Sequence, residues 1–574
     1  MPSRTFGWVQ DASSISNLRR VVEIFDSSTD INTELRDKKI LVLVKDKKLK
    51  NHFIGLLSSE AIKISYSDLV GRHPSGVPRS ESICNGIIQA AIPGQGREFI
   101  GDWPANNYLR WAHCVGLITY NKKEDNFKIS DEGAALITTS PKSTEEYKIL
   151  EKAFLSYPPV IRILNLLSDG SHLTKFEIGN KLGFVGEDGF TSLPQNILIR
   201  ELSLTTNAIE KRTMLSDWEG TSDKYVRMIA SWCKQMGWIE QSPKQVTIQI
   251  GNKTYQDQIA QAYFIKRKGL EARRKGVGIN TQKRIPKRVY WEMLATKAVD
   301  RNYVRTRRAH ILKLLSTAGK SLKQLKARLA ALGFNENIAT IEDDIKGLIN
   351  IGLNVESSSS KYSLRDTVID LEIPRLPSAE SRKSEIQKLI DKCREQLSLV
   401  PHDYLVLIEM SFNRNDNRLL EMETIELLIN EYGYSGIHLG GASKPDGIIY
   451  IESTPNNYGV IIDTKAYLDG FSIPINEKRK MVDYVNKNRS RRGTGWWDEF
   501  PKAIREFKFL FVSSSFIGQF RSQLKEISQD TDGTLGSVIS TYNMLRLAEK
   551  VKSGQHDLIS VGTMLGSLDE IKSF

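Results

Sequence analysis

Two acidic residues and a lysine in the C-terminal third of the chain have the types and spacing that metal-assisted hydrolysis needs. Asp446 follows Pro445, and Asp463 lies two residues before Lys465. The runs around them are rich in Ile, Val and Tyr and are separated by the turn signal Pro-Asn-Asn, which predicts a β-hairpin over residues 444–467. Side chains alternate between the faces of a strand, so Asp463 and Lys465 should project from the same face.

This arrangement suits hydrolysis of a phosphodiester. The carboxylates of Asp446 and Asp463 can together hold a hard divalent cation such as Mg²⁺, with waters and a substrate phosphate in the remaining positions. The cation polarises the phosphodiester and lowers the pKa of a bound water. Lys465 can orient or help deprotonate that water and offset charge on the transition state.

The same residues allow a plainer interpretation, a surface hairpin with solvated charges, because such short motifs occur by chance. The surrounding sequence favours chemistry, since Asp463 stands inside an apolar run and residues 419–432 predict an amphipathic helix before the hairpin. Glu421 and Glu426 on that helix are candidates for supporting the site from outside the set of residues that bind the metal directly. The motif resembles that of the PD-(D/E)xK nucleases, in which two acids bind metal and the lysine serves the nucleophile.

Length and composition describe a soluble chain of several domains. Single hydrophobic cores rarely exceed a few hundred residues, and this chain has 574. Its apolar runs are too short to span a membrane and its start has no signal-peptide pattern, so we expect a cytoplasmic protein. Four scattered cysteines, Cys84, Cys114, Cys233 and Cys393, favour reduced thiols over disulfides or a zinc site.

Charge is distributed unevenly along the chain. The formal net charge is +13. Residues 384–574 carry 23 Lys and Arg against 26 Asp and Glu, or −3, whereas residues 1–383 carry 58 against 42, or +16. A basic surface favours a polyanionic partner, so affinity for phosphate should lie in the N-terminal two-thirds. The strongly basic stretch 284–308 is either a phosphate track or a charged packing face.

A repeated pattern organises the N-terminal region. Three times a predicted helix ends in a glycine suited to a left-handed C-cap, at Gly116, Gly237 and Gly352, and is followed by two short strands. A helix and a two-stranded wing form the end of a winged helix. Residues 172–184 and 321–334 have helix-turn-helix spacing, and such units place one helix in the major groove of DNA. We expect the third unit to make protein contacts instead.

These patterns divide the chain into five segments. Three mainly α-helical, winged-helix-like subdomains should occupy residues 1–145, 146–283 and 284–368. A linker with two prolines should occupy 369–384, and an α/β domain with helices flanking a mixed sheet should occupy 385–574.

Basic, amide and aromatic residues interleave in the first two units, where DNA contacts are expected. Arg and Lys can address guanine edges or phosphates, and Gln can address adenine. Taken singly, each such residue is more often a solvated surface residue. The candidates are Arg79, Gln95, Trp103, Glu219 and Lys224.

Runs spread over every predicted domain carry a wider resemblance, among them RTFGWVQ, LRWAHCVGL, GFTSLP, WEGTSDKY, YGYSGIHLGGASKPDGIIY and YGVIIDTKAY. Across its whole length the sequence resembles the FokI-like type IIS restriction endonucleases of the PD-(D/E)xK superfamily. The resemblance implies winged-helix-like recognition subdomains and a cleavage domain that cuts duplex DNA at a fixed distance outside an asymmetric site of the GGATG type. It also implies Mg²⁺ as cofactor, a bacterial host and a cognate DNA methyltransferase.

The resemblance also implies roles for individual positions. The family's catalytic acids fall on Asp446 and Asp463 and its lysine on Lys465, and the five candidate DNA contacts match positions that the family uses near bases. Where the family has two asparagines, this chain has Asp11 and Ser216. A base contact is worth roughly 1–3 kcal/mol of discrimination, so identical sequence specificity does not follow.

A further departure concerns the pairing of two cleavage domains. The family pairs them through an acid and an arginine one helical turn apart, and here Arg479 and Asp483 hold those positions with the charges exchanged. In a two-fold interface residue i meets j and j meets i, so the reversed pair is still self-complementary. The alternative is an ion pair within one helix.

The sequence therefore predicts a Mg²⁺-dependent type IIS endonuclease that binds double-stranded DNA, pairs transiently as a homodimer and leaves 5′-phosphate ends. Two alternatives stay open. One is a winged-helix DNA-binding regulator whose C-terminal domain only dimerises. The other is a strand-nicking variant, which would follow if Arg479 and Asp483 do not support pairing.

Overall fold

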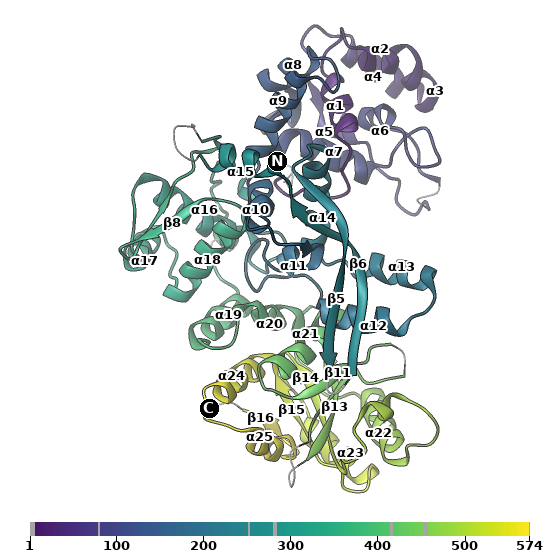
Figure 1. Ribbon diagram of the computed structural model, residues 1–574, viewed down its shortest axis with the longest axis vertical. Coiled ribbons are helices and arrows are strands. Elements are labelled where there is room, and N and C mark those ends of the chain that lie inside the picture. The colour runs from purple at the N-terminus through teal and green to yellow at the C-terminus, as the bar shows by residue number, and fades with distance from the viewer. Residues whose placement is uncertain are drawn as a thin grey trace.

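The three helical units and the α/β domain expected from the sequence are all present in the computed structural model (Figure 1). The N-terminal helices lie at one end of the molecule, the mixed sheet lies at the other, and the third helical unit projects from the side. The structure describes residues 6–78, 81–250, 253–278, 284–380, 382–413, 417–441, 443–452 and 457–572.

The first unit is helical with a small antiparallel sheet in the order β1-β3-β2. Its wing, β2 and β3, follows α7 through Gly116, whose φ of 80° is the left-handed value that a helix C-cap requires. The elements are α1 (Ile15–Glu23), α2 (Asp30–Glu34), α3 (Ile40–Leu43), α4 (Lys47–Leu57), β1 (Ile64–Ser65), α5 (Tyr66–Val70), α6 (Ile87–Ala91), α7 (Asp102–Cys114), β2 (Ile118–Asn121), β3 (Asn126–Ile129), α8 (Asp131–Ile137) and α9 (Thr144–Leu155).

The second unit has a much longer wing. Strands β5 and β6 form an antiparallel hairpin that reaches from the recognition helices to the sheet at the other end of the molecule (Figure 1). The elements are α10 (Pro158–Leu166), β4 (Leu173–Thr174), α11 (Lys175–Gly179), α12 (Gln195–Leu204), α13 (Ala208–Asp217), α14 (Thr221–Gln235), β5 (Ile239–Ile250), β6 (Lys253–Ile265) and α15 (Arg267–Val277).

The third unit repeats the pattern with a short wing, β8 and β9. Gly237 and Gly352, which precede the second and third wings, have φ of 72° and 106°, so the glycine signal is confirmed in all three copies. The elements are β7 (Lys287–Arg288), α16 (Arg301–Thr317), α17 (Leu322–Ala331), α18 (Ile338–Asn350), β8 (Val355–Ser358), β9 (Lys361–Leu364) and β10 (Val368–Ile369).

The C-terminal domain is built on a six-stranded sheet in the order β11-β12-β13-β14-β15-β16. The pairs up to β13 are antiparallel and the later ones are parallel. Helices cover both faces, which explains strands that are buried along nearly their whole length. The elements are α19 (Glu385–Gln396), α20 (Val406–Ser411), α21 (Asn417–Asn430), β11 (Ser435–His438), β12 (Gly447–Ile451), β13 (Tyr458–Lys465), α22 (Ile475–Ser490), β14 (Glu506–Ser513), α23 (Phe520–Asp530), β15 (Gly536–Ser540), α24 (Thr541–Lys552), α25 (Leu558–Leu565) and β16 (Glu570–Ile571).

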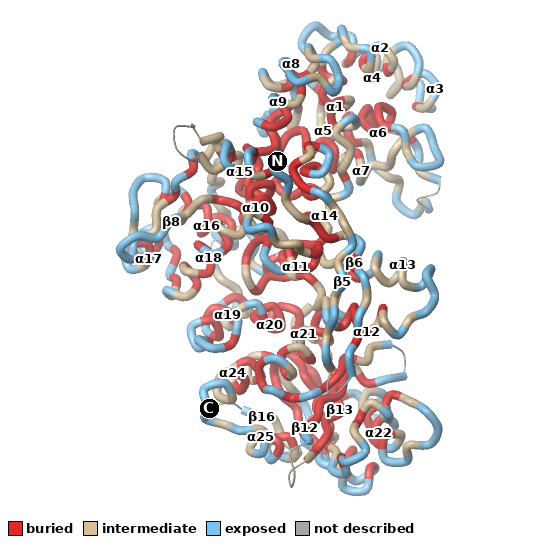
Figure 2. The backbone as a smooth tube through the Cα atoms, viewed as in Figure 1, coloured by how far each residue is buried: buried red, intermediate tan, exposed pale blue. Residues whose placement is uncertain are grey.

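Buried apolar residues form one large cluster through the recognition units and two clusters in the C-terminal domain, one on each face of its sheet (Figure 2). A smaller cluster joins the two parts, because Met422 of α21 packs with Phe176, Leu198 and Trp218 of the second unit. The guanidinium of Arg418 also lies 4.4 Å from the ring centre of Trp218. The second unit and the C-terminal domain therefore share a packed interface.

Buried ion pairs fix the third unit at the same junction. Asp344 accepts from Arg307 Nε and Arg308 Nε, both at 2.7 Å, and all three side chains are almost fully buried. The network extends to Glu187 of the second unit and, through Glu336, Lys383 and Asp391, to Arg394 of α19. The basic stretch 284–308 is therefore in part a charged packing face, since three of its arginines are buried.

All four cysteines are free and buried, as expected. Within the described ranges, no helix is both long and apolar enough to cross a membrane.

The Asp344 cluster gives a stability prediction. Asp344→Asn removes the charge that compensates two buried arginines, and an uncompensated buried charge costs about 3–5 kcal/mol. We expect the free energy of unfolding, measured by denaturant titration, to fall by that amount. Glu356→Gln is the control, because it breaks the exposed Glu356–Arg365 ion pair, worth about 0–1 kcal/mol. Equal losses in the two variants would contradict the role given to Asp344.

Candidate active site

The predicted hairpin is present and brings the two acids together. Strand β12 pairs antiparallel with β13, with Gly447 opposite Ile462, and the backbone N–H of Asp446 donates to the carbonyl of Ile462 at 3.1 Å. Asp446 therefore lies at the start of β12, beside Asp463. Its Oδ2 accepts from the Thr464 amide at 2.6 Å and the Thr464 hydroxyl at 2.8 Å, which fixes the carboxylate.

Negative charge is concentrated at this point. Burial raises the pKa of Asp446 well above its ordinary value, and the carboxylates of Asp463 and Glu421 add to that shift. Burial also raises the pKa of Asp463, against the opposing effect of Lys465. Two buried carboxylates that disfavour each other's ionisation form a site that a cation would stabilise.

Lys465 projects from the same face as Asp463, as strand alternation predicts. Its Nζ lies 2.7 Å from Asp463 Oδ2 and 3.2 Å from Glu477 Oε2. Burial alone would lower the pKa of Lys465, but the carboxylates of Asp463 and Asp446 outweigh burial and raise it. Lys465 is thus an ammonium, which can donate hydrogen bonds and offset negative charge in this state.

Of the two candidate helpers on α21, only one reaches this face. Glu421 Oε2 lies 3.6 Å from His438 Nε2, and Glu421 contributes to the raised pKa of Asp446. Glu426 instead accepts from Asn430 at 2.9 Å and lines a cavity between the two parts of the molecule.

The donor set fits a hard divalent cation. Among the described residues no cluster of three or more His, Cys, Asp or Glu side chains has the arrangement of a metal site. Mg²⁺ nevertheless is usually held by one or two carboxylates, with waters and substrate phosphates. Asp463 Oδ2, despite its ion pair with Lys465, and His438 Nε2 are buried atoms without a well-aligned hydrogen-bond partner in the described structure, as expected at a site meant for a further ligand.

The structure brings three of the predicted DNA-contact residues together. Trp103 Nε1 donates to Asp11 Oδ2 at 2.5 Å, and Arg227 lies 3.9 Å from Asp11 Oδ1 and 3.0 Å from Glu219 Oε1. Lys175 also pairs with Glu219 at 2.7 Å. Asp11 and Trp103 of the first unit are thus linked to Glu219 of the second.

Sequence reasoning missed Arg227, which joins these residues. It lies three positions after Lys224 on α14, and residues three apart lie on one face of a helix, so that spacing was an available signal. It also missed His438 and Glu477, which only the pairing of β11 with β12 and the packing of α22 bring to the acids.

The remaining predicted residues lie apart from this network. Gln95 and Ser216 are exposed, and Lys224 is half-buried in the first turn of α14. Arg79 lies outside the described residues. Arg479 and Asp483 are exposed on α22, where the carboxylate of Asp483 pairs with Lys487 at 2.7 Å.

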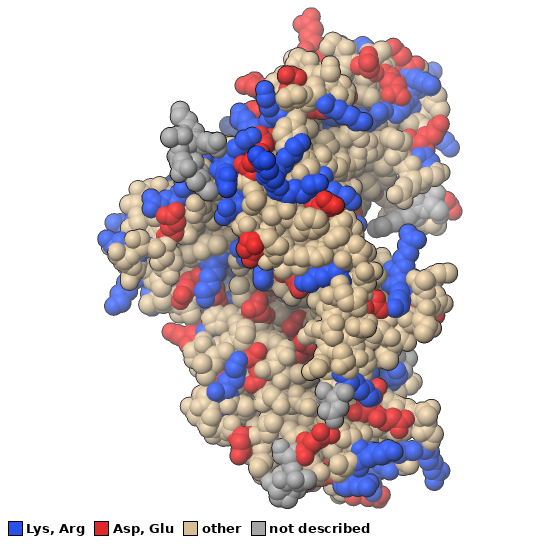
Figure 3. All heavy atoms as spheres, in the orientation of Figure 1, with Lys and Arg blue, Asp and Glu red and all other residues tan. Residues whose placement is uncertain are grey.

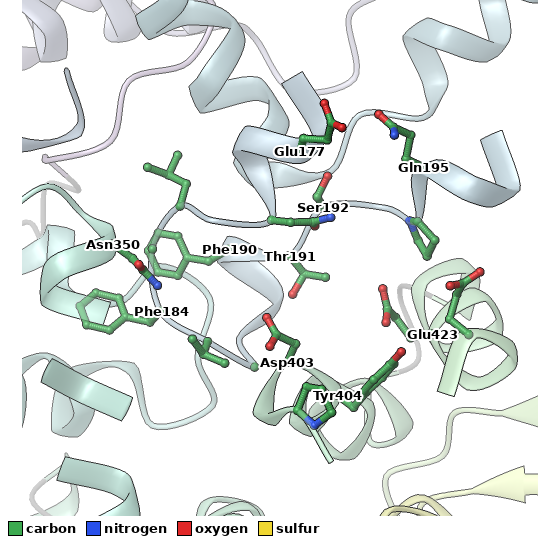
Figure 4. A pocket seen from close by; sticks show the side chains of 18 of the residues that line it. Glu177, Phe184, Phe190, Thr191, Ser192, Gln195, Asn350, Asp403, Tyr404 and Glu423 are labelled. Carbon is green, nitrogen blue, oxygen red and sulfur yellow. The ribbon is translucent and has the colours of Figure 1, made fainter. Parts of the chain in front are cut away.

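A cavity of about 440 Å³ lies between the second unit and the C-terminal domain, away from Asp446. In Figure 4, Glu423, Asp403 and Tyr404 of the C-terminal domain face Thr191 and Gln195 of the second unit. Acidic side chains show in the hollow between the two parts in Figure 3. Burial raises the pKa of Glu423 to about 8, and Glu426 and Asp403 contribute.

The C-terminal domain, a mixed sheet with two acids and a lysine on one face, has the form of a PD-(D/E)xK nuclease. Family models of FokI match four stretches of the chain: recognition-domain subdomain 1 at residues 4–139, recognition-domain subdomain 2 at 146–283, the D3 domain at 294–360 and the cleavage domain at 381–572. The chain belongs to the FokI family of type II restriction enzymes.

Individual relatives agree over nearly the whole length. The chain is 43% identical over 562 residues to the type II restriction enzyme FokI of Planomicrobium okeanokoites, covering 96% of each. It is 30% identical over 571 residues to the type II restriction enzyme StsI of Streptococcus sanguinis, covering 96% of this chain and 92% of that one. A solved structure of the restriction endonuclease FokI superposes with a TM-score of 0.90, and one of FokI bound to DNA with a TM-score of 0.92, each at 41% identity and covering 99% or more of both chains.

The cavity gives a pH prediction. The ordinary pKa of a glutamate is about 4.3, so a folded value of about 8 means that Glu423 adds stability below its unfolded pKa, and that this stability is lost as the pH rises through 8. The amide in Glu423→Gln does not titrate. We expect the melting temperature of Glu423→Gln to rise relative to the parent between about pH 5 and pH 9.

Glu395→Gln makes the same chemical change at an exposed position of α19 and is the matched control. A melting-temperature difference between Glu423→Gln and the parent that stays constant over this pH range would contradict the prediction.

Proposed function

We propose that this chain is a type IIS restriction endonuclease that binds an asymmetric site in duplex DNA and cuts both strands at a fixed distance outside it. The observation that carries the proposal is the convergence of Asp446, Asp463 and Lys465 on one face of the cleavage sheet. Mg²⁺ is the proposed cofactor, because paired carboxylates with room for water and phosphate suit it. The proposed bacterial setting is the cytoplasm, with a cognate methyltransferase.

DNA recognition is proposed for the first two units. Support comes from the +16 charge of residues 1–383, from the Asp11–Trp103–Arg227–Glu219 network and from the likeness to FokI bound to DNA. We keep the domain divisions after residues 145, 283, 368 and 384 as part of this proposal. The proposed recognition sequence is of the GGATG type, and Asp11 and Ser216 are the positions at which this chain would differ in sequence specificity.

The reaction follows from what each side chain can do. Asp446 and Asp463 would hold the cation, and Thr464 keeps the Asp446 carboxylate in place through two hydrogen bonds. When bound, the cation polarises the phosphodiester and makes a coordinated water more acidic. The Lys465 ammonium orients the attacking water and offsets charge at phosphorus.

Bond changes then follow in-line attack. The water oxygen bonds to phosphorus, the bond from phosphorus to the 3′ oxygen breaks, and the proton lost by water is balanced by protonation of that oxygen. The products are a 3′-hydroxyl and a 5′-phosphate. One domain has one such site and hydrolyses one strand, so a second copy is needed for a double-strand cut.

Digestion of a fully sequenced plasmid with the purified protein and Mg²⁺ tests the proposal. We expect discrete ends at a constant offset from one shared asymmetric motif, and the motif itself shows whether Asp11 and Ser216 changed specificity. DNA that is bound but uncut would sink the nuclease assignment, and single-strand breaks alone would favour the nicking variant.

The catalytic assignment predicts a separation of cutting from binding. Asp446→Ala and Lys465→Ala should each reduce cleavage at least about a thousandfold, the effect of losing several kcal/mol of transition-state stabilisation, and should leave DNA binding in a gel-shift assay unchanged. Asp530→Ala removes an exposed carboxylate from α23 of the same domain and should cut normally. A fully active Asp446→Ala protein would refute the assignment.

The proposed pairing surface on α22 gives a prediction of its own. In Arg479→Asp the two paired helices present only carboxylates at this contact, and in Asp483→Arg they present only guanidinium groups. Each variant alone should therefore show double-strand cleavage reduced at least tenfold, because like charges repel. An equal mixture of the two should recover it. Unchanged double-strand cleavage by Arg479→Asp alone would place the pairing surface elsewhere.

A further inference from the structure

Glu477 contacts the lysine of the proposed nuclease site from outside the hairpin. It lies in the first turn of α22, and its Oε2 is 3.2 Å from Lys465 Nζ. Its other oxygen, Oε1, accepts from Lys480 of the same helix at 2.8 Å. Asp463, Lys465, Glu477 and Lys480 thus form a chain of alternating charge that runs from the buried hairpin to the surface of α22.

The helix that carries Glu477 is held firmly against the sheet. Met481, Tyr484 and Val485 of α22 are buried in the same apolar cluster as Ile461 of β13 and Phe511 of β14. An ion pair of 2.5 Å between Lys478 and Glu526 also ties α22 to α23. The position of the Glu477 carboxylate relative to Lys465 is therefore set by packing.

The contact is largely shielded from solvent. The side chain of Glu477 is 16% exposed and that of Lys465 is 18% exposed. Burial alone would raise the pKa of Glu477, but Lys480 and Lys465 outweigh burial and lower it, so the carboxylate is charged. A shielded charge pair orients its members better than an exposed one, because water screens it less.

Sharing the ammonium has a chemical consequence. A lysine ammonium has three donors. If Asp463 were its only partner, the Lys465 ammonium would be directed only at the carboxylate that is needed to bind the cation. Glu477 gives the ammonium a second acceptor on the side of α22, so that two of its donors are directed and the third is left for a water or a phosphate oxygen.

We propose that Glu477 is a positioning residue of the nuclease, which shares the Lys465 ammonium with Asp463 and so aims it at the reacting phosphate. The inference rests on the proposed function. It also links two features of α22, because Arg479 and Asp483 of the proposed pairing surface follow Glu477 on that helix. The helix that is proposed to contact a second copy therefore also positions Lys465.

The test compares Glu477→Leu with Glu477→Gln in the full-length protein. Both kcat and KM for cleavage of a DNA duplex that carries the site are measured with Mg²⁺, alongside the melting temperature. Leucine has a similar size but accepts no hydrogen bond, so we expect kcat to fall about tenfold with KM unchanged, the effect of one hydrogen bond to a charged group. Glutamine still presents a carbonyl oxygen to the ammonium and should restore most of kcat.

Glu395→Leu is the matched control, because it makes the same chemical change at an exposed position of α19, away from α22 and Lys465. It should leave kcat unchanged. Parent-like kcat in Glu477→Leu would overturn the inference. The inference would also be overturned if the leucine and glutamine variants lost kcat equally and in proportion to their fall in melting temperature. Such losses would indicate that Glu477 only supports the structure. A parent protein that binds DNA and never cuts it would instead refute the proposed function, and this inference with it.

Discussion

The burial of charge is the constraint on which the rest of the structure depends. Asp344 lies between Arg307 and Arg308 almost without contact with water, and desolvation on that scale is tolerated only when partners and geometry compensate for it. Because the network also includes Glu187 and Arg394, the second unit, the third unit and α19 meet at one electrostatic junction. That junction and the Met422 contact place the cleavage sheet below the recognition helices.

The proposed active site also buries charge, but here the carboxylates are not fully compensated by the chain. At Asp344 the chain supplies the counter-charges itself. At Asp446 and Asp463 the described residues supply one contacting lysine, Lys465, which also pairs with a third carboxylate, Glu477. The deficit of positive charge suits a site that must accept a cation and a phosphate together. A site whose carboxylates were all paired with lysine or arginine would bind the cation and the phosphate less well.

Local patterns in the sequence predicted much of this structure. Apolar runs separated by a turn signal predicted the hairpin, and strand alternation predicted the common face of Asp463 and Lys465. Three glycines marked the three wings, because a left-handed φ leaves a direct trace in sequence. Contacts between distant segments leave no such trace. Arg227 and Glu477 were missed for that reason, and Arg307 counted toward a basic surface although it is buried in an ion pair.

The position of β13 inside the sheet has a consequence for how such chains diverge. It is paired with β14 along its whole length and with β12 from Tyr458 to Ile462, so a one-residue slip would break two ladders and turn Asp463 and Lys465 to the opposite face. An insertion or deletion between Asp463 and Lys465 would break the ladder with β14 in the same way. The interval from the second acid to the lysine should therefore stay at two residues as such chains diverge.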